Sequence, residues 1–156
     1  MNKGQRKAFT MLELVFVVVI IGILSAVAIP RFAVTRDDAI LAKDKAVVGS
    51  VRSALVMERQ KRILRGDFTP ITSLNSTGTN VAFSTFSPDK NDKKADVLEY
   101  HVNDCTGLGK TKGCWSVIGT TYRYYMPLTG TVDFNITNGR FDCITPTDSN
   151  CKLLTL

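Results

Sequence analysis

A run of 21 residues near the start of the chain, residues 9–29, contains one charged side chain, that of Glu13. At about 1.5 Å per residue, a helix of this length nearly spans the roughly 30 Å hydrocarbon core of a bilayer. The segment before the run, residues 1–8, is basic, and basic flanks stay on the cytoplasmic side of a membrane. The run therefore predicts one membrane-spanning helix, with the C-terminal part of the chain outside the cytoplasm.

A cleaved secretory signal peptide is the alternative explanation of this run. It has the same basic start, and Ala26-Val27-Ala28 offers an A-x-A cleavage site. Three features argue against it: a glutamate inside the apolar run, the length of the run, and a helical pattern that continues beyond the site. We therefore favour a helix that the mature protein keeps.

Glu13 needs a partner, because a lone carboxylate near a bilayer centre costs about 2.5–3.5 kcal/mol on insertion scales. The sequence alone does not identify that partner. The alternative is that the Glu13 side chain reaches out to the polar surface of the membrane.

A second helical pattern follows the apolar run. Charged residues fill one face, and Gly66 suits the position just after a helix end. Pro30 cannot donate a backbone hydrogen bond to Ala26, so we expect a bend or local melting there. We predict one helix from Phe9 to about Arg65, whose second half needs an apolar partner. Its apolar stripe recurs at spacings of three, four and seven and comprises Ile40, Leu41, Val47, Val48, Val51, Ala54 and Leu55.

The remainder of the chain predicts a small antiparallel sheet. Residues 67–95 are rich in turn-forming residues and indicate a surface connection, with a short strand around residues 81–83. Asn138-Gly139 is a strong signal for a tight hairpin. We therefore expect an α+β fold with about four strands, packed against the second half-helix. The candidate strands are VLEYHV, CWSVIG, TYRYYM, TVDFNI and RFDCI.

The four cysteines lie in the last third of the chain. Their number is even, no CxxC spacing occurs, and the chain has a single histidine, so a zinc site is not indicated. After a membrane-like segment, two disulfides in an oxidising compartment are the economical interpretation. Four cysteines allow three connectivities, and we favour the local pairs Cys105–Cys114 and Cys143–Cys151.

The segment AFTMLELVFVVVIIGILSAVAIPRF, residues 8–32, resembles the N-termini of type IV pilins and of the pseudopilins of type II secretion systems. The shared features are a short basic leader, Phe9 at the cleavage site, Glu13 at the fifth mature position, Gly22 in the apolar run and Pro30 near its end. The family usually has glycine where Ala8 stands, and we expect slower cleavage at most. Beyond Pro30 the resemblance is one of architecture.

The resemblance implies four parts: a leader (residues 1–8), an apolar assembly helix (9–30), its amphipathic continuation (31–66) and a globular head (67–156). The head would hold an αβ-loop, the sheet and a C-terminal cysteine loop. A prepilin peptidase would cut between Ala8 and Phe9 and methylate the new amino group of Phe9.

The resemblance also implies roles for four residues. In a fibre, the buried amine of Phe9 would pair with the carboxylate of Glu13 on a neighbouring subunit, which would fix their register. Gly22 and Pro30 bracket a stretch that loses regular helix in family fibres, and both residue types weaken helices. The alternative for Gly22 is close helix packing in the membrane.

The implied function is a structural fibre subunit without catalytic residues, metal or cofactor. It would wait in the bacterial inner membrane as a single-pass protein with its head in the periplasm. An assembly platform with an ATPase would polymerise it, with itself or with related subunits, into a filament in the periplasm or at the cell surface. The short head leans towards a type II secretion pseudopilus. The alternatives are a pilus for adhesion or DNA uptake, and a monomeric membrane-tethered binding domain.

Two ligands, calcium and DNA, are alternatives to a subunit that binds no ligand. Calcium could bind the oxygens of Asp142, Asp148, Ser149 and Asn150, although no EF-hand spacing is present and turn formation explains these residues equally well. DNA, in a competence filament, could stack on exposed aromatic rings, but core packing accounts for most of the candidates: Trp115, Tyr122, Tyr124 and Tyr125.

Overall fold

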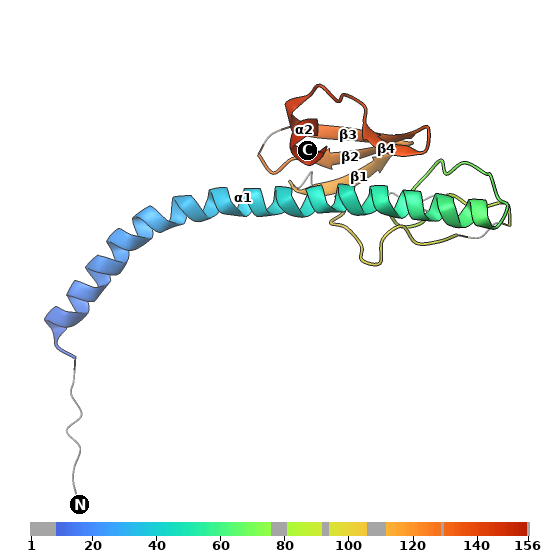
Figure 1. Ribbon diagram of the computed structural model, residues 1–156. Coiled ribbons are helices and arrows are strands. Elements are labelled where there is room, and N and C mark those ends of the chain that lie inside the picture. The colour runs from blue at the N-terminus through green and yellow to red at the C-terminus, as the bar shows by residue number, and fades with distance from the viewer. Residues whose placement is uncertain (1–8, 76–80, 92–93, 106–111, 129, 156) are drawn as a thin grey trace, which may run out of the picture. The chain divides into compact units, whose positions relative to one another are not determined.

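The computed structural model describes residues 9–75, 81–91, 94–105, 112–128 and 130–155. The chain forms two compact units, Met1–Asp37 and Asp38–Leu156. Helix α1, Met11–Leu64, begins in the first unit and continues into the second (Figure 1). The predicted long N-terminal helix and the predicted α+β fold are both confirmed.

The first unit consists of the apolar half of α1. The helix starts after Thr10, whose side-chain oxygen accepts a hydrogen bond from the N–H of Glu13 at 3.3 Å. It remains helical through Gly22 and Pro30. The melting that the family resemblance implies concerns assembled fibres, and it stays a prediction.

The second unit contains a four-stranded antiparallel sheet in the order β1-β2-β3-β4. The strands are β1 (Cys114–Ile118), β2 (Thr121–Tyr125), β3 (Thr131–Thr137) and β4 (Arg140–Cys143). Four of the five candidate strand segments are therefore confirmed.

The predicted hairpin between β3 and β4 is also confirmed. Asn138 and Gly139 both have positive φ, 53° and 73°, as a tight two-residue turn between twisted strands requires.

Two predictions about the head were wrong, and one element was missed. Residues 97–102 form no strand; isolated bridges lie on either side of the segment, Thr85 with Asp96 and Asp104 with Trp115. The strand expected around residues 81–83 is likewise absent from the described part of that segment. A short helix, α2 (Ser149–Thr155), follows the sheet and was not predicted.

The core of the head lies between the second half of α1 and the inner face of the sheet. Val48, Val51 and Leu55 on α1 are buried, as the apolar stripe predicted. Phe83 reaches into the same core from the loop after α1, with ring centroids 4.9 Å from Trp115 and 5.4 Å from Tyr122. The aromatic core of the sheet is completed by Tyr124, Phe134 and Phe141.

The described cysteines form two disulfides, Cys105–Cys114 and Cys143–Cys151. These are the local pairs that the spacing favoured. The first joins β1 to the segment before it, and the second joins the end of β4 to α2. Both therefore fasten the C-terminal part of the head rather than α1.

Candidate functional site

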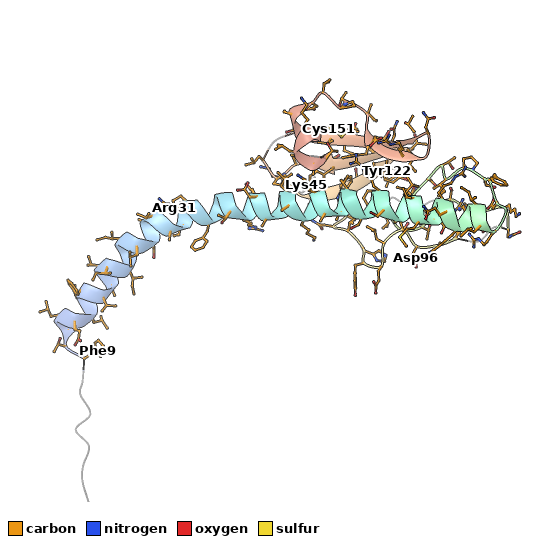
Figure 2. All side chains as sticks on the ribbon, viewed as in Figure 1. Phe9, Arg31, Lys45, Asp96, Tyr122 and Cys151 are labelled. Carbon is orange, nitrogen blue, oxygen red and sulfur yellow. A yellow bond between two sulfur atoms is a disulfide. The ribbon has the colours of Figure 1, made fainter. Side chains whose placement is uncertain are left out.

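The apolar half of α1 has no partner within its own unit. The most apolar 18-residue window of α1 is 0% buried, and Figure 2 shows side chains projecting from the helix on all sides between Phe9 and Arg31. By length and composition, α1 is the one helix among the described residues that could cross a membrane. Apolar area of this kind needs lipid or other protein around it.

Glu13 lies in the first turn of this exposed helix. Its carboxylate is exposed, and no described cation lies within ion-pair distance of it. An acidic residue in the first turn is favourable because the N-terminal end of a helix carries partial positive charge. The structure therefore places Phe9 and Glu13 at the same helix end without pairing them, and Ala8 lies outside the described residues.

Thr10 is a helix-start residue that the sequence analysis missed. Its carbonyl and hydroxyl oxygens both receive the backbone N–H of Glu13, at 3.1 and 3.3 Å. The spacing Thr10-x-x-Glu13 is the pattern of a capping box, which was visible in the sequence. Thr10 thus caps the start of the helix through the backbone N–H of Glu13, and the acidic side chain of Glu13 suits that helix end.

Asp44 ties the second half of α1 to the sheet, and it too was missed. The residue is 3% exposed, and its carboxylate accepts hydrogen bonds from Trp115 Nε1 at 2.9 Å and from the Tyr124 hydroxyl at 2.7 Å. Burial raises the pKa of the Asp44 carboxyl above its ordinary value, while the two hydrogen bonds and the charge of Lys43 oppose that rise. The sequence carried a signal, because Asp44 stands four residues before Val48 on the apolar stripe.

The end of α1 holds a second buried polar group. Arg62 is 0% exposed, and its guanidinium binds the Glu58 carboxylate at 3.0 Å and the carbonyl of Ser87. Arg62 lies in the last turn of α1, where a cation is favourable at the surface, but its side chain lies in the core. Arg65, which is half exposed, reaches both Glu58 and Asp89 at 3.5 Å.

Asp67 fixes the turn that leads away from α1. Its carboxylate accepts hydrogen bonds from the hydroxyl and the N–H of Thr69, at 2.6 and 2.9 Å, and from the N–H of Lys90 at 3.1 Å. These hydrogen bonds, led by the one from the Thr69 hydroxyl, lower the pKa of Asp67 to about 2.

The residues considered for calcium have other contacts in the structure. Asp142 on β4 pairs with Arg52 at 2.9 Å and with Arg140 at 3.4 Å. The Asp148 carboxylate accepts the backbone N–H of Asn150 at the start of α2. Within the described residues, no group of three or more His, Cys, Asp or Glu side chains is placed to hold a metal ion.

The aromatic residues considered for DNA are mostly in the core. Trp115 and Tyr124 are 0% exposed and Tyr122 is 1% exposed, so their faces cannot stack on a nucleic acid at the surface of the head. The Tyr122 hydroxyl donates to Asn75 Oδ1 at 2.8 Å and accepts the N–H of Leu74 at 2.6 Å. Its burial raises its pKa to about 12.

Comparison with known proteins agrees with this arrangement. Residues 3–29 match the family model of the prokaryotic N-terminal methylation motif. The chain is also similar to the type IV narrow pilus major component PilA5 of Thermus thermophilus, with 52% identity over 50 residues. That alignment covers 32% of this chain and 43% of PilA5, so less than half the length of the relative is matched. No solved structure matches the chain.

The N-terminal match and the architecture point the same way. The motif covers the apolar helix, the relative is a pilin, and the fold places a long helix before an antiparallel sheet. The prepilin-type motif includes the apolar half of α1. This combination fits a membrane-anchored protein of a structural family. The N-terminal motif, the similarity to a type IV pilin and the fold together support a protein of the type IV pilin and pseudopilin family.

Proposed function

We propose that the protein is a structural subunit of a type IV pilus-like filament. The observation that carries the proposal is the apolar half of α1, whose most apolar window contains no buried residue in the single chain and which falls within the methylation motif. Lipid would surround this half-helix before assembly, and the same half-helices of other subunits would surround it afterwards. The proposal assigns the protein no catalysis and no cofactor.

The proposed route to the filament follows the family. The leader, residues 1–8, is removed between Ala8 and Phe9 by a prepilin peptidase, and the amine of Phe9 is methylated. The subunit then waits in the inner membrane with its head in the periplasm, and an assembly platform driven by an ATPase polymerises it. In the filament, Glu13 of one subunit pairs with the Phe9 amine of another.

The kind of filament is a finer proposal. The short head favours a type II secretion pseudopilus, whereas the matched relative is described as a pilus component. Mechanical shearing of intact cells separates the two, because a surface pilus is released into the medium and a periplasmic pseudopilus stays with the cell.

The experiment that tests the filament proposal replaces Glu13 with alanine. The variant is expected to insert into the membrane at the normal level and to lose pelletable polymer, because the buried amine of Phe9 is left without its counter-charge. Asp38→Ala is the matched control, since Asp38 is an exposed carboxylate on the same helix outside the apolar run. Normal polymer from Glu13→Ala would contradict the pairing, and a parent protein that forms no polymer would contradict the proposed function.

A further inference from the structure

The head carries a cleft beside α1 whose one charged lining residue, among those described, is Arg59. It has a volume of about 530 Å³, within the range of sites that receive ligands or side chains. A smaller hollow of about 210 Å³ adjoins it and shares Leu55 and Gly139 with it. Arg59 lines the larger cleft, and Arg52 and Arg140 line the smaller one.

The cleft and its neighbour have more cations than anions. The smaller hollow contains one carboxylate, Asp142, which Arg52 and Arg140 share at 2.9 and 3.4 Å. Arg59 Nη1 donates to the carbonyls of Phe68 and Thr69 at 3.3 and 3.1 Å, and no described carboxylate pairs with Arg59. A negatively charged partner would therefore meet guanidinium groups that are already held in place.

A second surface of the head carries more carboxylates than cations. In the loop of residues 94–101, Asp96, Glu99 and Tyr100 are exposed, with Tyr100 79% exposed, and Lys94 is the exposed cation beside them. No described cation forms an ion pair with either carboxylate. Figure 2 shows Asp96 on the side of α1 opposite the sheet. Tyrosine and arginine are enriched at binding hot spots, and here an exposed tyrosine stands beside two carboxylates.

We propose that this loop, residues 94–101, docks into the arginine-lined cleft of a second copy of the chain. The ring of Tyr100 enters the larger cleft, Glu99 faces Arg59, and Asp96 faces Arg140. This inference rests on the proposed filament function and assigns a contact between heads. Because the loop and the cleft are different surfaces, the contact is heterologous, and a heterologous contact that does not close on itself propagates into a helical filament.

Cysteine cross-linking tests the contact directly. A chain carrying both Tyr100→Cys and Thr72→Cys, the latter in the cleft wall, is expressed in the cells that assemble the protein and oxidised. We expect a ladder of multimers on a non-reducing gel, with peptide mapping showing a linkage between the two introduced cysteines. Each single variant should give no ladder, because one surface then lacks its thiol.

The outcomes separate this inference from the proposed function. Polymer that pellets normally without the linkage overturns the docking contact and leaves the filament proposal intact. A linkage to a different protein also overturns it, because the occupant is then not a second copy. If the parent chain forms no polymer, the filament function and the contact fail together.

Charge reversal gives an independent readout. Arg59→Glu alone and Glu99→Arg alone should each lower the yield of polymer by about two- to five-fold or more, since a favourable pair becomes a repulsive one. The double reversal should restore most of the yield. Lys152→Glu, an exposed cation on α2 outside the cleft, is the control and should leave the yield unchanged. Equal losses in the single and double variants would overturn the pairing.

Discussion

The Tyr124 hydroxyl on β2 donates a hydrogen bond of 2.7 Å to the Asp44 carboxylate on α1, and both residues are buried. Trp115 on β1 donates to the same carboxylate at 2.9 Å. One polar side chain on the helix therefore holds two neighbouring strands. In the proposed fibre subunit, this joint would connect the assembling helix to the head.

Replacing Asp44 should loosen that joint. Asp44→Ala leaves the Trp115 and Tyr124 donors buried without an acceptor, so we expect the free energy of unfolding of the head to fall by about 1–3 kcal/mol. Asp44→Asn keeps one acceptor oxygen and should lose less. Urea denaturation of the detergent-solubilised protein, followed by tryptophan fluorescence, measures both. An Asp44→Ala variant as stable as the parent would show that the hydrogen bonds do not offset the cost of burying the carboxylate.

The stability of the head should depend on pH through two carboxylates with opposite shifts. The pKa of Asp67 is lowered to about 2, so its contribution is present above the ordinary value of 3.8 and is lost as pH falls towards 2. The pKa of Asp44 is raised, so the native state binds a proton more tightly, and stability falls as pH rises above 3.8.

Matched variants separate these two effects. Asp67→Asn should flatten the acid limb of a stability–pH curve, and Asp44→Asn should flatten the decline at higher pH. Thermal unfolding between pH 2 and pH 7 provides the curve. An unchanged acid limb in Asp67→Asn would contradict the assignment to Asp67.

The buried pair of Glu58 and Arg62 should be costly to break. Glu58→Ala leaves the Arg62 guanidinium buried without its counter-ion, and such losses are about 3–5 kcal/mol. Replacing both residues, Glu58→Leu with Arg62→Met, should recover most of that loss, because a well-packed apolar pair is often as stable as a buried ion pair. Arg140→Ala, at a 79% exposed side chain, is the control and should change stability by about 1 kcal/mol or less. Denaturant titration measures all three, and a double variant as unstable as the single one would contradict the prediction.

Two glycines with positive φ should respond differently to alanine. Gly139 has open space where a Cβ would lie, so Gly139→Ala should cost about 1–2 kcal/mol for the left-handed backbone alone. At Gly113 a Cβ would lie 2.7 Å from Ile40 Cγ2, so Gly113→Ala adds a clash with α1 to the same backbone cost. We expect the larger loss of thermal stability at Gly113. Equal losses would mean that the Ile40 side chain moves aside at little cost.

The parts of the fold that the sequence predicted are those with a long or strongly local signal. The apolar run needs only its length and composition to predict a membrane helix, and the stripe at Val48, Val51 and Leu55 repeats often enough to define a buried face. Asn138-Gly139 specifies its turn locally. The cysteine pairs followed because short spacings favour local closure.

The features that the sequence did not yield depend on contacts between distant residues. Asp44 and Arg62 continue the spacing of the apolar stripe, but a charged residue at such a position breaks the apolar pattern in the sequence. Only the structure shows that Trp115 and Tyr124 bind Asp44 and that the Ser87 carbonyl binds Arg62. The segment around Glu99 alternates like a strand, yet it lies outside the sheet because residues 103–105 occupy the edge of β1 instead. At that edge the Trp115 N–H donates to the Asn103 carbonyl, and the Trp115 carbonyl accepts the N–H of Cys105.

The most direct test of the fibre account is the intact mass and N-terminal sequence of the protein isolated from its own membranes. The account predicts a mature chain that begins at Phe9 with a methylated amine, carrying Glu13 four residues further on. A chain that begins at Ile29 would contradict it, because cleavage after Ala28 would discard the apolar helix together with Glu13 and leave an exported head that cannot assemble in this way.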